Sequence, residues 1–260
     1  MGQLSPRWLI FLHLPRTAGT TFVRILERQY GADAVLDVYD STFGEEVAAR
    51  TELEQVCVIT GHFYFGIHTH LSGPCRYVTF LRDPVERVVS HYHFVRRHPD
   101  HYLYPTASTS TLAEYVTSCG AAEPNNDQTR LLAGRDLASS DGTWSPEMLP
   151  AAIQNLDALF TIGLTEDFDA SLIAMQGLFG WRRPFYVPQN IGARANDTLP
   201  SEIGDLIRAY NALDVELYKH ARERVEVELA RHGPAFARRV QMFKRLNSLY
   251  GVASRVAQRR

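Results

Sequence analysis

A short loop between an apolar segment and a helical one carries residues suited to binding a phosphate-like anion. The sequence FLHLPRTAGTTF spans residues 11–22, and a helix is expected to begin near Thr20. Backbone N–H groups at a helix N-terminus carry partial positive charge, so a loop of this kind binds anions. The nucleoside triphosphate version has the pattern G-x-x-x-x-G-K-[ST], whereas here Arg16 precedes the single Gly19. We therefore predict an anion site that differs from an ATP or GTP loop.

A second candidate cation follows another apolar segment, in YVTFLRDPVERVVSHYHFVRR, residues 77–97. Arg82 comes directly after a predicted strand, Asp83 is expected to cap a helix, and Pro84 fits its first position. Open α/β sheets bind ligands at the carboxyl ends of their strands. Ser90, two turns into the helix, can add a hydroxyl to the same anion. For Arg82 alone, an ion pair with a neighbouring carboxylate is the alternative.

Short apolar segments alternate with amphipathic ones along the chain. This alternation predicts an α/β fold with a central, mostly parallel sheet flanked by helices, in one domain over residues 1–232 followed by a helix over 233–260. The strands are expected at Trp8–Leu14, Val35–Tyr39, Val56–Thr60, Arg76–Leu81 and Ala158–Leu164. The helices are expected at Thr20–Tyr30, Phe43–Gln55, Pro84–Arg97, Thr111–Cys119, Asn125–Ala133, Pro146–Leu156, Asp167–Gly177 and Pro200–Arg231, with loops at His98–Ser110 and Gly134–Ser145.

Composition and length narrow the class of protein. The 260 residues are 45% apolar and 22% charged, as in ordinary soluble domains. No apolar run is long enough to span a membrane, and the N-terminus lacks the features of a signal peptide. Three scattered cysteines fit neither a disulfide framework nor a zinc site. We therefore expect a cytoplasmic protein without a transmembrane segment.

Charge is distributed unevenly along the chain. The net charge of −2 argues against a nucleic-acid binder, yet from Arg231 onward there are eight basic residues and no acidic one. Apolar residues recur there at helical spacing, which predicts a basic amphipathic helix. Such a helix either docks on the acidic body of the protein or makes peripheral contact with a membrane or another anionic partner.

Taken together, LPRTAGTT and RDPVERVVSHYHF resemble the two cofactor-binding motifs of sulfotransferases that use 3′-phosphoadenosine 5′-phosphosulfate (PAPS). The likeness is closest to the uronosyl group, such as heparan sulfate 2-O-sulfotransferase, and it extends to ITGHFYFG, NNDQTRLLAG and FTIGLTEDFDASL. The resemblance implies a P-loop-like sulfotransferase fold and sulfuryl transfer from PAPS to a hydroxyl of a glycan or a small glycosylated or secondary metabolite. No metal is expected to be required.

The resemblance also implies roles for individual residues. Arg82 and Ser90 would hold the 3′-phosphate. Arg194 lies where relatives have a loop that closes over the nucleotide, and a solvent-exposed loop arginine is the alternative. Arg16 occupies the position of a catalytic lysine in relatives and would stabilise the leaving phosphate. The first loop would hold the 5′-phosphosulfate through Arg16, Thr17, Ala18, Gly19, Thr20 and Thr21.

His62 is the predicted general base. It matches a catalytic histidine of the uronosyl group, although relatives have H-G-H where this chain has Thr60-Gly61-His62. A hydrogen-bonded structural histidine is the alternative. His13 is expected to shape the cofactor site, and Asp127 and Gln128 either line the acceptor site or cap a helix.

Two other functions remain open from the sequence. A P-loop-type small-molecule kinase would use the first loop as a degenerate nucleotide site, and a non-catalytic module would bind the cofactor or its product without needing His62. Neither the acceptor nor the oligomeric state follows from the sequence.

Overall fold

The computed structural model describes residues 6–38, 55–118, 123–134, 137, 145–189 and 199–257. The predicted helix Phe43–Gln55 and most of the predicted loop Gly134–Ser145 lie outside this part of the chain.

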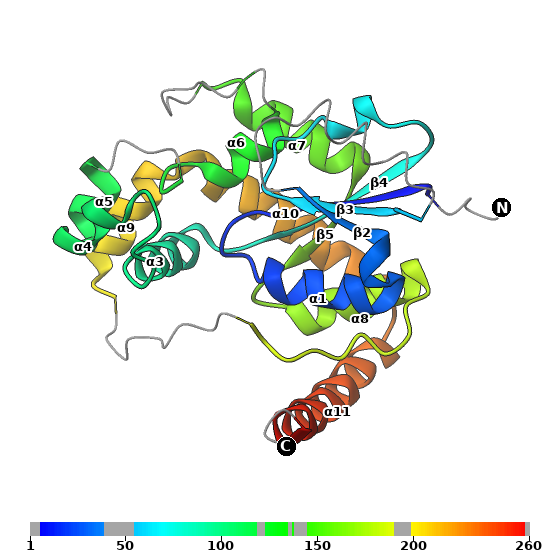
Figure 1. Ribbon diagram of the computed structural model, residues 1–260. Coiled ribbons are helices and arrows are strands. Elements are labelled where there is room, and N and C mark those ends of the chain that lie inside the picture. Colours follow the sequence, from blue (N-terminus) through cyan, green and yellow to red (C-terminus); the bar gives the residue numbers. More distant parts are fainter. Residues whose placement is uncertain are drawn as a thin grey trace.

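A five-stranded parallel sheet forms the centre of the protein (Figure 1). Its strand order is β2-β3-β1-β4-β5, so β1 lies in the middle between β3 and β4. All five predicted strands are present, and the predicted α/β fold is confirmed. The strands are β1 (Trp8–Leu12), β2 (Val35–Asp37), β3 (Val58–Gly61), β4 (Cys75–Leu81) and β5 (Phe160–Leu164).

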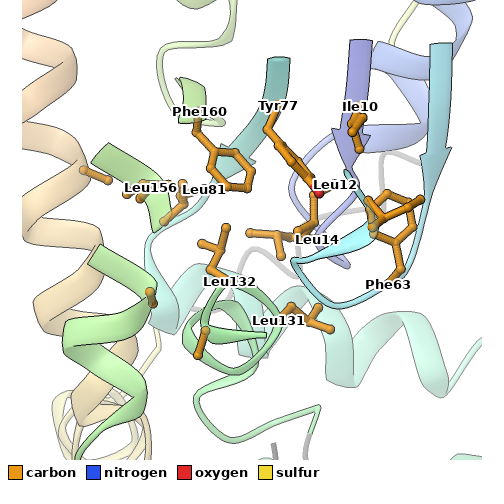
Figure 2. Packing of buried hydrophobic residues seen from close by; sticks show 14 of the residues in the cluster. Ile10, Leu12, Leu14, Phe63, Tyr77, Leu81, Leu131, Leu132, Leu156 and Phe160 are labelled. Atoms are coloured by element: carbon orange, nitrogen blue, oxygen red, sulfur yellow. The ribbon is translucent and has the colours of Figure 1, made fainter. Parts of the chain in front are cut away.

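The alternating side chains of β1 serve two separate cores. Ile10 and Leu12 point to one face of the sheet, where they pack against α6, α7 and α10. Leu9 and Phe11 point to the other face, against α1, α8 and α11. Because successive residues of a strand face opposite sides, a fully apolar β1 requires helices on both faces. Figure 2 shows the first core, in which Leu132 of α6 lies near residues of β1 and β4.

Helices cover both faces of the sheet and extend beyond one edge of it (Figure 1). Two short 3-10 turns add Ala32–Ala34 and Ile67–His70. The helices are α1 (Gly19–Tyr30), α3 (Pro84–Val95), α4 (Tyr104–Thr109), α5 (Leu112–Ser118), α6 (Asp127–Ala133), α7 (Met148–Leu159), α8 (Phe168–Phe179), α9 (Ser201–Tyr210), α10 (Ala212–Ala230) and α11 (Ala235–Ala257). No helix within the described ranges has the length and apolar character needed to cross a membrane.

Two predictions about helices are wrong. The expected loop at 98–110 contains α4, whose Ser- and Thr-rich sequence has weak helix propensity but whose Ala107 is fully buried. The single helix expected over 200–231 is broken at Asn211, which has φ −121°. The Asn211 side chain donates to the carbonyl oxygens of Pro124 and Ile207 and accepts the N–H of Asn126, so long-range hydrogen bonds fix the break.

The sheet places three of the predicted site segments at one edge. Strands β3, β1 and β4 are adjacent and parallel, so their carboxyl ends at Gly61, Leu12 and Leu81 lie side by side. His62, the 13–18 loop and Arg82 follow these three ends directly. The edge where open α/β sheets bind ligands therefore carries both predicted motifs.

Candidate functional site

The loop between β1 and α1 turns through two residues in the left-handed region. Arg16 has φ 70° and Ala18 has φ 65°, a conformation that residues other than glycine rarely adopt and that often marks a functional loop. Ala18 is the N-cap residue of α1, and no side chain in the described part of the chain caps the helix there. The first N–H groups of α1, from Gly19 onward, can therefore bind an anion.

The three threonines of this loop have different surroundings. Thr17 is fully buried, and its hydroxyl donates to the carbonyl oxygen of Leu14 at 2.8 Å. Thr21 is also buried, and its hydroxyl oxygen accepts the N–H of Gln189 at 3.0 Å. Thr20 is exposed on the first turn. The Thr17 side chain thus closes the loop, which leaves its backbone N–H as the group that can face an anion.

The two predicted motifs meet in one cluster. Nη1 of Arg82 donates to the carbonyl oxygen of Arg16 at 3.2 Å, and Nε of Arg16 donates to Oγ of Ser90 at 3.2 Å. Arg82 forms an ion pair of 3.3 Å with Glu86 and not with its neighbour Asp83, which caps α3 as predicted. Partners that are 66 and 74 positions apart in the sequence are therefore brought together by the fold.

Positive charge is in excess at this cluster. Burial, followed by repulsion from Arg82 and Arg97, lowers the pKa of Arg16 to about 10. The guanidinium stays protonated at neutral pH and lies over the ring of Phe94, with Cζ 4.4 Å from the ring centroid. Glu86, which pairs with Arg82, is 53% exposed and compensates this charge weakly. A bound anion would relieve the repulsion, so the cluster fits a multiply charged ligand.

The side-chain amide of Gln128 holds the backbone of Arg82 from both sides. Its Oε1 accepts the N–H of Arg82 and its Nε2 donates to the carbonyl oxygen of Arg82, each at 3.0 Å. Asp214, fully buried at the start of α10, accepts the N–H of Gln128 at 3.3 Å and two hydrogen bonds of 2.7 Å from Thr129. Gln128 therefore positions Arg82, a role that neither sequence alternative for this residue included.

A buried ion-pair cluster supports this clamp. Arg87 is fully buried. Its Nη1 lies 3.4 Å from Oδ2 of Asp127, and its Nε lies 3.8 Å from Oδ2 of Asp214. Its Nη2 donates to the carbonyl oxygen of Glu123 at 2.8 Å. Arg130 also pairs with Asp127, so Asp127 is engaged inside the protein. Neither Arg87 nor Asp214 was predicted from the sequence to belong to the site. The one sequence signal was that Arg87 falls on the apolar face of α3.

A hydrogen bond to the backbone fixes the tautomer of His62. Its Nδ1 lies 2.6 Å from the carbonyl oxygen of His13, and because a carbonyl only accepts, Nδ1 carries the proton and Nε2 of the neutral ring has the lone pair. The surrounding protein desolvates the ring and lowers the pKa of His62, although the hydrogen bond to His13 and the charges of Asp127 and Glu123 oppose this. The side chain still reaches solvent, so His62 is neutral and accessible near pH 7.

His13 connects the anion loop to His62. Its ring centroid lies 4.3 Å from that of His62 and 5.3 Å from that of Phe11. A Cβ at Gly19 would lie 1.9 Å from two atoms of the His13 ring, so glycine is required for this contact. Burial, followed by repulsion from His62 and Arg16, holds the pKa of His13 well below its usual value. The neutral His13 packs against the anion loop and His62, and the expectation that it shapes the cofactor site stays a prediction.

Two other residues singled out in the sequence are Arg194 and Thr60. Arg194 lies outside the described residues. Thr60, which stands where relatives have a second histidine, is fully buried, and its hydroxyl has no hydrogen-bond partner among the described residues.

One group of potential metal ligands was not expected from the sequence. His91, His101 and Glu123 each place one ligand atom within 4.8 Å of the others. The N–H of Leu103 donates to Nδ1 of His101, so Nε2 of the neutral ring carries the proton, whereas a metal needs a lone pair there. His91 contacts Glu123 at 3.3 Å and the hydroxyl of Tyr115 at 3.1 Å. This group therefore acts as a hydrogen-bonded cluster beside α3.

Comparisons with known proteins relate nearly the whole chain to enzymes that transfer sulfate. The family model for galactose-3-O-sulfotransferase matches residues 3–249. A heparan-sulfate 6-O-sulfotransferase 3-B of Danio rerio is 26% identical over 266 residues, covering 83% of this chain and 63% of the relative. A galactose-3-O-sulfotransferase 3 of Mus musculus is 27% identical over 176 residues, covering 63% of this chain and 40% of the relative. This chain thus spans 40% to 63% of the length of these curated relatives.

Among solved structures, a mouse sulfotransferase complexed with PAP matches at 15% identity. It covers 78% of this chain and 64% of that chain, with a TM-score of 0.42.

Proposed function

Because this chain belongs to the galactose-3-O-sulfotransferase family, we propose that it transfers a sulfuryl group from PAPS to a hydroxyl of a carbohydrate acceptor. The family match confirms the sulfotransferase resemblance seen in the sequence. The observation that carries the proposal is the cluster of Arg16, Arg82 and Ser90 beside the N-terminus of α1.

The residues present fit the donor. A molecule with phosphate groups at both ends of its ribose needs cations and N–H donors in two places, and it is large enough to contact both motifs. The first N–H groups of α1 and the guanidinium of Arg16 would hold the 5′-phosphosulfate. Arg82, whose backbone is fixed by Gln128, would hold the 3′-phosphate together with Ser90.

The chain's own residues supply charge and a proton acceptor. When bound, the donor supplies an activated sulfuryl group on a phosphate leaving group. Arg16 would stabilise the negative charge that grows on that phosphate, which is weakly basic and leaves without protonation. His62 would take the proton of the acceptor hydroxyl on Nε2, since Nδ1 is fixed on the His13 carbonyl.

Binding measurements test the donor assignment. We expect adenosine 3′,5′-bisphosphate to bind without Mg²⁺, and adenosine 5′-phosphate and ATP to bind more weakly because each lacks the 3′-phosphate. Arg82→Ala should lose about 1.5–3 kcal/mol of this binding, the range for a charge-assisted hydrogen bond. Arg24→Ala is the matched control for net charge. It removes an exposed guanidinium of α1 whose ion pair among the described residues is with Glu27.

Transfer assays test the reaction itself. Donor labelled in the sulfuryl group should label a carbohydrate acceptor, with galactosides first in the panel because of the family. Equal affinity for adenosine 5′-phosphate would refute the 3′-phosphate roles of Arg82 and Ser90. Binding of the bisphosphate without transfer to any acceptor in the panel would favour a non-catalytic binding module.

A further inference from the structure

Helix α11 has two apolar faces, and within the part of the chain that the structure describes only one of them packs on the protein. Phe236, Val240 and Phe243 are buried against the core that includes α8. Figure 1 shows α11 at the periphery of the molecule, beyond α8. On its other side α11 carries apolar side chains that are between 45% and 67% exposed. We call them the outer stripe: Met242, Leu246, Leu249, Val252 and Val256.

The outer stripe follows the helical repeat. Met242, Leu246 and Leu249 are separated by four and three residues, so they lie on one side of the helix. At about 100° per residue, the centre of the stripe is roughly opposite the buried Phe236 and Val240. Large apolar residues scattered singly over a surface need no explanation. Five of them aligned on one helix face, away from the core, indicate a surface that is covered in function.

The charge of α11 indicates which kind of partner covers the outer stripe. From Arg231 onward every charged residue is basic, whereas the rest of the chain holds 29 acidic and 19 basic residues. Arg238, Arg239 and Arg245 are exposed. At about 100° per residue, Arg238 and Arg245 lie on the same side of the helix as the outer stripe, and Arg239 lies beside it. A second copy of α11 would bring arginines against arginines with no acidic residue to pair them. An anionic bilayer instead attracts this helix and repels the acidic body, which favours an orientation with α11 facing the lipid.

We propose that α11 binds the surface of an anionic lipid bilayer. The helix lies parallel to the membrane plane, with the outer stripe at the boundary between headgroups and acyl chains. These arginines extend their aliphatic stems along the apolar surface and keep their guanidinium groups among the lipid phosphates. The buried face of α11 stays on the protein, so the anchor needs no unfolding of the core.

Vesicle flotation with the full chain tests this proposal. The protein should float with vesicles of phosphatidylcholine mixed with phosphatidylglycerol, should not float with phosphatidylcholine alone, and should be released by high salt. The pair Leu246→Gln and Leu249→Gln should weaken vesicle binding by at least about tenfold, because each leucine loses apolar contact. The pair Arg238→Gln and Arg245→Gln should weaken it by roughly 25-fold, about fivefold for each basic residue.

Control variants distinguish binding through the outer stripe from non-specific hydrophobic adsorption to vesicles. Tyr210→Gln and Val227→Gln replace exposed apolar residues of α9 and α10, which are 38% and 56% exposed, and should leave vesicle binding unchanged. Thermal unfolding of each variant verifies that it is folded. The proposal is overturned if the parent protein does not bind anionic vesicles. It is also overturned if the variant with both leucines replaced binds them as well as the parent does. It is also overturned if the protein is a dimer that the leucine pair converts to a monomer, since a second copy then covers the stripe.

Discussion

Replacing Gly19 by alanine should disturb the contact between the anion loop and the two histidines. A Cβ there would lie 1.9 Å from Cδ2 and Nε2 of His13, so the ring has to move. The ring is held between Phe11 and the ring of His62, and the His13 carbonyl orients His62. The added methyl group therefore displaces His13, and the shift of His13 moves His62, the predicted base.

The size of the effect follows from the packing. Overpacking of a well-filled site costs about 2 kcal/mol, which for a chain of this length lowers the Tm by roughly 4–8 °C. Without the clash, alanine near the start of a helix would be neutral or better, since it loses less backbone entropy than glycine. Turnover should fall more than stability alone explains, because a misplacement of about 1 Å at a reacting group can cost on the order of a hundredfold.

Gly177→Ala is the matched control for this variant. Gly177 lies inside α8 and a Cβ there would meet nothing within 4 Å, so the substitution should raise the Tm slightly and leave turnover unchanged. Thermal unfolding, binding of adenosine 3′,5′-bisphosphate and the rate of sulfuryl transfer are measured for both. If Gly19→Ala is as stable and as active as Gly177→Ala, the packing of His13 does not position the base.

Four other predictions concern single residues. His62→Ala should reduce turnover by a factor of about 10²–10⁴ and should retain cofactor binding. In the parent protein, activity should fall as the pH drops through the pKa of His62, which lies below 6.5. A pH–rate profile that is unchanged in His62→Gln would place the base elsewhere. Arg16→Lys should retain turnover and Arg16→Met should lose most of it, because a cation is needed at the leaving phosphate; full activity of Arg16→Met contradicts this. Thr60→Val should stabilise the protein by about 1 kcal/mol in thermal unfolding, since it removes a buried hydroxyl that has no partner among the described residues; a lower Tm would show that the hydroxyl is bonded. Gln128→Met should weaken bisphosphate binding by about tenfold through loss of the clamp on Arg82, seen by calorimetry, whereas unchanged affinity would mean that the arginine is positioned without it.

The sequence by itself determined the five strands, many of the helices and the positions of the two anion motifs. Apolar periodicity and local capping residues such as Asp83 encode these features within a few positions of the chain. The family resemblance rests on the same local segments, so it too could be recognised without a structure. His62 was placed correctly after β3 for the same reason.

Only the tertiary structure decided how these residues act on one another. The contact between Arg16 and Ser90 joins positions 74 apart, and the clamp of Gln128 on Arg82 joins positions 46 apart. The break at Asn211, which brings Asp214 to the start of α6, depends on hydrogen bonds to residues 124 and 126. The tautomer of His62 is set by the carbonyl oxygen of His13, which directly follows β1. Such partners leave no local pattern, because an arginine or an aspartate in a helix has the same neighbours in sequence whether it faces water or a buried counter-charge.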